Sequence, residues 1–172
     1  FMRKPDRKIL IKSDYLRKEA ELYIDYISKG EDLNANQFMQ KTLRDVNEGG
    51  EYLNNWVYEQ TKAILDKGKL VGLLGGDHST PLGYFRAIAE KKGEFGILQI
   101  DAHCDLREGY EGFNYSHASI MYNALREIPQ LQNIVQAGVR DFGSDEWEYI
   151  RNSNYRVTTY FDKDIKHRQY SG

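Results

Sequence analysis

The chain has 172 residues, with 24 Lys and Arg against 26 Asp and Glu, so its formal net charge is −2. This length suits a single domain with a core of useful size, and the near balance of charge excludes the clustered basic excess of a nucleic-acid-binding surface. No apolar run approaches the roughly 18 residues of a membrane span, and no apolar h-region of a secretory signal follows the first residues. The single cysteine, Cys104, cannot form an internal disulfide, which fits a cytoplasmic protein.

Residues 1–68 are rich in charge and predict three amphipathic helices. The helices are expected over residues 13–30, 34–46 and 51–67, with Ser13 as the first N-cap and with Gly49 and Gly50 ending the second helix. Apolar side chains recur on one face of these segments and charged residues line the other faces. We therefore expect residues 1–68 to be cover helices that pack on a core.

Residues 69–161 alternate short apolar runs with helical segments. Strands are predicted at residues 70–74, 95–100, 134–139 and 157–161, and helices at residues 80–92, 118–127 and 145–152. Such alternation implies right-handed crossovers and a mostly parallel central sheet with helices on both faces. No repeat or Pro-rich linker interrupts the sequence, so one α/β domain over residues 1–172 is the simplest organisation.

Polar clusters follow three of the predicted strands, at residues 75–79, 101–105 and 138–141. In parallel α/β sheets, functional sites form outside the carboxyl ends of the strands. In the second cluster, Asp101, His103 and Asp105 alternate by two, which places their side chains on one side of an extended segment. Carboxylates and an imidazole that converge in this way favour a divalent cation, Mn²⁺ before Zn²⁺ or Fe²⁺. A turn with solvated acids is the alternative.

Two neighbouring residues bear on this interpretation. His78 stands at the end of the preceding apolar run, where it can join the cluster. Cys104 points to the opposite side under the same alternation, so we expect a small buried residue there and no thiolate ligand.

Four motifs in this region resemble those of the ureohydrolase family, which includes arginases, agmatinases and formimidoylglutamases. They are Gly-Gly-Asp-His-Ser at 75–79, Asp-Ala-His-Cys-Asp at 101–105, Ser-His-Ala-Ser at 116–119 and Gly-Val-Arg at 138–140. The resemblance implies a three-layer arginase-like fold, two Mn²⁺ ions per active site and a homo-oligomer, trimeric or hexameric. It also implies hydrolysis of a guanidino or formimino C–N bond through a hydroxide that bridges the two ions.

The resemblance also implies roles for the polar residues of the first two motifs. His78 and Asp105 match ligands of one manganese ion, and His103 matches a ligand of the other. Asp101 matches the ligand that bridges both ions, and so belongs to the catalytic centre. Together these four residues would hold the metal and its reactive water.

The loop before residue 119 is similar to the family's substrate loop. His117 matches a histidine near the substrate that can relay a proton to the leaving amine, and Ser116 is expected to contact the substrate beside it. The alternative for His117 is a surface loop histidine. Residues 113–118 read closer to agmatinase patterns than to the arginase loop that recognises an α-amino acid head.

The substrate is a small guanidino compound under this resemblance, and two positions bear on which one. Gly143 offers no acid to hold an α-ammonium group, which favours agmatine over arginine. Arg107 favours a substrate with a carboxylate, such as formimidoylglutamate. The alternative is a loop arginine paired with Glu108 or Glu111.

The family's late Ser-x-Asp-x-Asp-x-x-Asp-Pro segment, whose Asp-x-Asp pair completes both metal sites, does not occur in this sequence. Asp162-Lys163-Asp164 follows a predicted strand but lacks the leading Ser and the following Asp-Pro. Asp101 and Asp105 alone would leave two divalent ions short of ligands and negative charge. The sequence is therefore interpreted as an internal portion of a longer ureohydrolase, inactive by itself. A metal-poor paralogue that binds a partner without turnover is the alternative.

Overall fold

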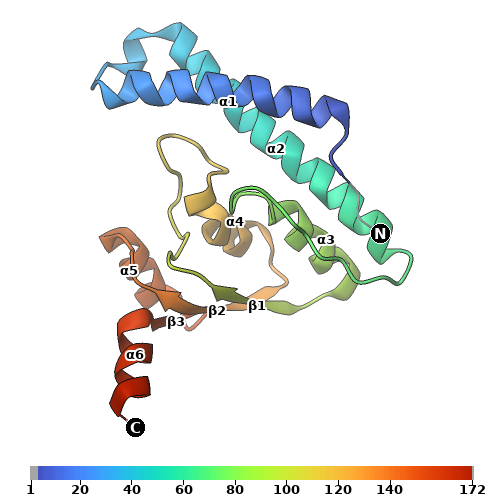
Figure 1. Ribbon diagram of the computed structural model, residues 1–172, viewed down its shortest axis with the longest axis vertical. Coiled ribbons are helices and arrows are strands. Elements are labelled where there is room, and N and C mark those ends of the chain that lie inside the picture. The colour runs from blue at the N-terminus through green and yellow to red at the C-terminus, as the bar shows by residue number, and fades with distance from the viewer. Residues whose placement is uncertain (1–3, 172) are drawn as a thin grey trace.

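The computed structural model describes residues 4–171, in which a helical hairpin precedes a strand–helix region (Figure 1). The helices are α1 (Arg7–Ser28), α2 (Gln37–Leu65), α3 (Leu82–Lys92), α4 (Ile120–Glu127), α5 (Ser144–Asn152) and α6 (Asp162–Ser171). The strands are β1 (Phe95–Ile100), β2 (Leu131–Val139) and β3 (Val157–Phe161), and short 3-10 turns cover Leu33–Ala35 and His117–Ser119. Among the described residues, no helix combines the length and the apolar character that crossing a membrane requires.

The first helix begins earlier than the sequence predicts. Its N-cap is Asp6, whose Oδ1 accepts a hydrogen bond from the backbone N–H of Ile9 at 2.9 Å. Ser13 lies inside the helix and does not cap it. Asp6 caps the helix because its carboxylate accepts a hydrogen bond from one of the free N–H groups of the first turn. Ile9 is buried at the start of α1.

The predicted break at Gly49-Gly50 is wrong, because α2 runs without interruption from Gln37 to Leu65. The two glycines mark places where other segments approach the helix closely. A Cβ atom at Gly49 would lie 2.1 Å from Leu16 Cδ1 in α1, and one at Gly50 would lie 3.1 Å from Tyr115 Cβ. Close packing of α1 and of the segment around Tyr115 thus outweighs the poor helix propensity of glycine, about 1 kcal/mol per residue.

The strand predicted at residues 70–74 is also wrong. Within the described residues this segment pairs with no strand, and Leu70 and Leu74 are 97% and 92% exposed. An apolar run becomes a strand only when a neighbour offers a ladder of hydrogen bonds. β1 pairs with β2 alone in residues 4–171, so the run stays unpaired.

The remaining strands form a parallel sheet in the order β1-β2-β3 over the described residues. β1 and β3 have the predicted bounds, and β2 begins three residues before the predicted strand, at Leu131. Figure 1 shows α3, α4 and α5 on one side of the sheet and α6 on the other. The predicted α/β fold with a parallel sheet and helices on both sides is therefore confirmed.

The apolar core lies between the sheet and helices α3, α4 and α5. Its most buried large side chains are Leu82, Ile120, Met121, Leu131, Ile134 and Val139. On the opposite face of β1, Leu98 and Ile100 are 67% and 82% exposed. The buried face therefore holds this part of the molecule together, and it brings the carboxyl ends of β1 and β2 side by side.

Candidate metal centre

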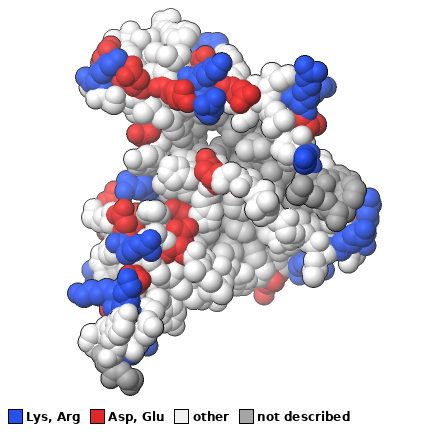
Figure 2. All heavy atoms as spheres, viewed as in Figure 1, with Lys and Arg blue, Asp and Glu red and all other residues white. Residues whose placement is uncertain are grey.

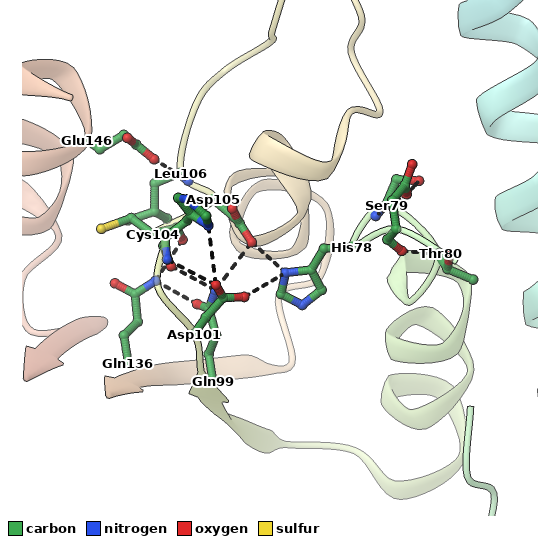
Figure 3. A network of polar contacts seen from close by, with 12 residues as sticks. His78, Ser79, Thr80, Gln99, Asp101, Cys104, Asp105, Leu106, Gln136 and Glu146 are labelled. Atoms are coloured by element: carbon green, nitrogen blue, oxygen red, sulfur yellow. Dashed lines mark hydrogen bonds and ion pairs between the residues drawn. The ribbon is translucent and has the colours of Figure 1, made fainter. Parts of the chain in front are cut away.

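A cluster of one histidine and two aspartates lies at the carboxyl end of β1 (Figure 3). His78 Nδ1 is 2.5 Å from Asp105 Oδ2 and 3.2 Å from Asp101 Oδ2. One donor atom from each of the three side chains lies within 4.8 Å of the others. The structure thus brings together three of the four residues that the sequence suggested as metal ligands.

The two aspartates are held by the backbone around them. Asp101 directly follows β1, and its Oδ1 accepts a hydrogen bond from the backbone N–H of His103 at 3.0 Å. Asp105 has a left-handed backbone with φ of 56°, and its carbonyl oxygen accepts the N–H groups of Met121 and Tyr122 at 3.0 and 3.2 Å. These donors belong to the first turn of α4, where helix N–H groups otherwise lack partners. The start of α4 therefore fixes the turn that carries Asp105.

His78 comes from a turn and not from the end of a strand. In this turn, Asp77 Oδ1 accepts the backbone N–H of Ser79 at 2.9 Å, and Asp77 O accepts the hydroxyl of Thr80 at 2.9 Å. The turn leads directly into α3 and directs the imidazole toward the end of β1 (Figure 3). His78 therefore reaches the cluster although the run before it pairs with no strand in the described part of the chain.

The electrostatics of the cluster fit a cation. The hydrogen bond that the Asp105 carboxylate accepts from His78 raises the pKa of His78, and the charges of Asp105 and Asp101 raise it further against the effect of burial. Burial raises the pKa of Asp101, but the backbone N–H of His103 and the charge of His78 outweigh burial and leave this pKa below its ordinary value. The two carboxylates concentrate negative charge beside one imidazole, and a divalent cation bound by oxygen and imidazole nitrogen would offset that charge.

His103 lies beside this group. Its Nδ1 is 3.5 Å from Asp101 Oδ1, its Nε2 is 3.9 Å from Asp141 Oδ2, and its side chain is 60% exposed. The backbones of His103 and Asp141 form a parallel bridge that extends the pairing of β1 with β2. The sequence analysis did not single out Asp141, because only this bridge places it next to the cluster.

The predicted substrate residues gather in the loop that follows Asp105. The ring of the exposed His117 meets the ring of Tyr110 edge-on, with the centroids 5.9 Å apart. The guanidinium of Arg107 lies over the ring of Tyr110, 5.3 Å from its centroid. Ser116 Oγ is 3.0 Å from Ser119 Oγ. Tyr110 therefore brings Arg107 and His117 to one place in the loop.

The suggested pairing of Arg107 with Glu108 or Glu111 is wrong, because Arg107 Nε lies 3.8 Å from Glu146 Oε2. Glu146 is 5% exposed and accepts the backbone N–H groups of Leu106 and Gly143 at 3.0 and 2.8 Å. The sequence analysis missed Glu146. Its position three residues after Gly143 matches the glutamate of a capping box, a local signal of the start of α5 that does not reveal its contact with Leu106 or Arg107.

The remaining candidates lie apart from the cluster. Asp162 and Asp164 belong to the first turn of α6, where Asp162 Oδ2 forms an ion pair of 2.7 Å with Lys166. Their strand, β3, is separated from β1 by β2, and neither aspartate belongs to the metal-binding group found among residues 4–171. Cys104 is fully buried, as the alternation predicted, and burial raises the pKa of its thiol to about 12.

Comparisons with known proteins agree with the four sequence motifs. The profile of the arginase family matches residues 12–171. The mitochondrial arginase of Medicago truncatula is 37% identical over 120 residues, which cover 69% of this chain and 35% of the relative. The N(1)-aminopropylagmatine ureohydrolase of Thermus thermophilus is 36% identical over 114 residues, which cover 66% of this chain and 36% of the relative.

Solved structures show the same relationship. The Medicago truncatula arginase has a TM-score of 0.62 at 32% identity, and the match covers 73% of this chain and 40% of that one. The agmatine ureohydrolase of Thermoplasma volcanium has a TM-score of 0.58 at 30% identity over 68% of this chain and 38% of that one. The chain spans little more than a third of the length of the curated relatives that it matches. By its motifs, its fold and the match to the family profile, the chain belongs to the arginase family.

Proposed function

We propose that the natural protein containing this chain is a Mn²⁺-dependent ureohydrolase that converts agmatine to putrescine and urea. The observation that carries the proposal is the convergence of His78, Asp101 and Asp105 at the carboxyl end of β1. Two similar proteins act on agmatine or an aminopropyl derivative of it, as their names state. Arginase-family membership supports the same reaction class.

In this proposal the four predicted ligands are part of the set that would hold two ions. His78 and Asp105 would bind one ion, His103 would bind the other, and Asp101 would serve both. Two manganese ions, when bound, supply an activated water and stabilise the negative charge that develops on the substrate. The chain's own contribution is rigidity, because the backbone N–H of His103 fixes Asp101 and the first turn of α4 fixes Asp105.

His117 is proposed to hold and release the proton that the leaving amine needs. An imidazole can accept and donate a proton near neutral pH. The edge of Tyr110 orients the ring of His117, which stays exposed at the loop surface. Ser116 keeps hydrogen-bonding capacity beyond its contact with Ser119, so we propose that its hydroxyl contacts the bound substrate.

Two features support agmatine over arginine. Gly143 provides no side-chain acid for an α-ammonium group, and its backbone N–H already donates to Glu146. A substrate carboxylate would need Arg107 as its partner, but Arg107 already has Glu146 and the Tyr110 ring beside it. A substrate whose far end is a cationic amine, with no carboxylate, fits this loop best.

Formimidoylglutamate is the second candidate substrate. The guanidinium side chain of Arg107 is 47% exposed, and its 3.8 Å contact with Glu146 is long for a direct ion pair. A substrate carboxylate could therefore replace Glu146 as its partner.

A substrate screen of the natural protein supplied with Mn²⁺ tests the proposal. We expect urea release from agmatine in preference to arginine. Release of formamide from formimidoylglutamate alone would instead make Arg107 the carboxylate-binding residue. A protein that binds fewer than two Mn²⁺ ions and turns over none of the three substrates would favour the metal-poor, non-catalytic alternative.

We further propose a cytoplasmic homo-oligomer, trimeric or hexameric, that binds no nucleic acid. Membership of the arginase family supports the oligomer, the single cysteine fits a reducing compartment, and the near-neutral charge agrees with the lack of nucleic-acid binding. Sedimentation of the natural protein in its metal-loaded form measures the oligomeric state directly.

A further inference from the structure

A row of polar side chains crosses the sheet inside the core, directly beneath the candidate metal centre. Gln99, Gln136 and Thr159 occupy paired positions on β1, β2 and β3. Gln99 is 3% exposed and Gln136 is completely buried. We call these three residues the buried polar row. Such groups are costly in a core unless every donor and acceptor is satisfied.

The hydrogen bonds of the row run in one direction. The Thr159 hydroxyl donates to Gln136 Oε1 at 2.7 Å, and Gln136 Nε2 donates to Gln99 Oε1 at 2.7 Å. Gln99 Nε2 then donates to Asp105 Oδ2 at 3.4 Å. The row therefore begins at β3 and ends on a carboxylate of the candidate metal centre. Figure 3 shows its Gln136 and Gln99 together with Asp105.

The same amides also hold the backbone next to Asp105. Gln136 Nε2 donates its second hydrogen to the carbonyl oxygen of Cys104 at 2.7 Å, and Gln99 Nε2 donates to that of His103 at 3.2 Å. Carbonyl and carboxylate oxygens only accept hydrogen bonds, so both amide nitrogens must face this turn. The orientation of each glutamine is thus fixed by its neighbours.

We propose that Gln99 and Gln136 are positioning residues that hold Asp105 and the turn at residues 103–105 in the arrangement that binds Mn²⁺. The inference rests on the proposed function, because it assumes that Asp105 is a metal ligand. Hydrogen bonds to a ligand from outside the coordination sphere orient it, and their loss lowers metal affinity by about 10- to 100-fold. Thr159 acts one step further away, by fixing the orientation of Gln136.

Substitutions that keep shape but remove the donors test the proposal in the complete natural protein. Gln99→Met and Gln136→Met have side chains of similar length and no amide, and Thr159→Val is nearly isosteric. Thr158→Val, on the exposed face of the same strand, is the matched control. The Mn²⁺ dissociation constant is measured by titration with the metal alone, and thermal unfolding of the metal-free protein is measured in parallel.

We expect Gln99→Met to raise the dissociation constant about 10- to 100-fold, Gln136→Met to raise it less, and Thr159→Val least. Thr158→Val should leave it unchanged. If Gln99→Met lowers only the unfolding temperature and binds Mn²⁺ like the parent, the row merely fills the core and the proposal is wrong. If Gln99→Met does not fold, Gln136→Met decides between these results, because parental affinity in that variant would also overturn the proposal.

The failure of this inference can be distinguished from the failure of the proposed function. A parent protein that binds no Mn²⁺ would overturn both. A parent that binds Mn²⁺ and releases urea, with the same metal affinity in all three variants, would overturn only the role assigned to the buried polar row.

Discussion

Cys104 stands between two proposed metal ligands in the sequence, yet its chemistry differs from theirs. Its side chain is completely buried, and burial raises the pKa of the thiol to about 12. A thiol reacts as its thiolate, so we predict that Cys104 does not react with a disulfide reagent at pH 8 while the protein is folded. Reagent absorbance measured with and without urea checks this. Rapid labelling of the native protein would show that the turn at residues 103–105 opens.

At the scale of helices, the contact between α2 and α3 depends on Gly83. A Cβ atom there would lie 2.0 Å from Asn54 O and 2.8 Å from Tyr58 N, both backbone atoms of α2. We predict that Gly83→Ala pushes the helices apart and lowers the free energy of unfolding by about 1–3 kcal/mol. Urea denaturation measures the change. Gly76→Ala is the control, because nothing lies within 4 Å of its added atom, and equal stability of the two variants would contradict the predicted crowding.

One arginine forms ion pairs that link three helices, and these pairs make the free energy of unfolding depend on pH. Arg86 of α3 forms ion pairs with Glu51 of α2 at 3.0 Å and with Glu127 of α4 at 2.6 Å. Burial raises the pKa of Glu51, but the hydrogen bond and charge of Arg86 outweigh burial, so this pKa is below its ordinary value. A carboxylate whose pKa is lower in the folded than in the unfolded state contributes stability above the unfolded pKa of about 4.3.

That contribution is lost as the pH falls through the folded-state pKa of Glu51. We predict that Glu51→Gln lowers the unfolding temperature at pH 7 and that the difference from the parent shrinks below pH 4. Calorimetry over pH 3–7 provides the measurement. A difference that stays constant or grows toward low pH would contradict the assigned ion pair.

Elements were predictable from the sequence where local pattern alone decides them. β1 and β3 have the predicted bounds because short apolar runs between polar turns are strands wherever neighbours pair with them. The merging of two predicted helices at Gly49 depends on contacts with α1, which no local pattern contains. Similarly, the run at residues 70–74 has strand-like composition, but pairing decides whether it becomes a strand.

The residues of the candidate site also divide into those that a local pattern predicts and those that tertiary contacts decide. Alternation by two placed Asp101, His103 and Asp105 on one side, and His78 joins the first and last of them. Glu146 and Gln99 were missed because their contacts depend on where α5 begins and on the register between strands. Those are tertiary properties, so a single sequence does not reveal them.

At the scale of the whole molecule, the side of β1 that faces away from the core stays open in residues 4–171. Leu98 and Ile100 are 67% and 82% exposed on that face of β1. Exposed apolar surface and an unpaired strand edge promote association with other chains. We predict that residues 1–172 expressed alone self-associate and bind a hydrophobic dye. A monodisperse solution with no dye binding, measured by sedimentation and fluorescence, would contradict this.

The central claim is that His78, Asp101, His103 and Asp105 are among the ligands that hold two manganese ions in the complete natural protein. Elemental analysis of the complete natural protein after dialysis against Mn²⁺, with Asp101→Asn and His103→Ala in parallel, tests it most directly. The account predicts two ions in the parent, loss of the two-ion site in Asp101→Asn because a bridging charge is removed, and selective weakening of one site in His103→Ala. Two fully occupied sites in Asp101→Asn would contradict it.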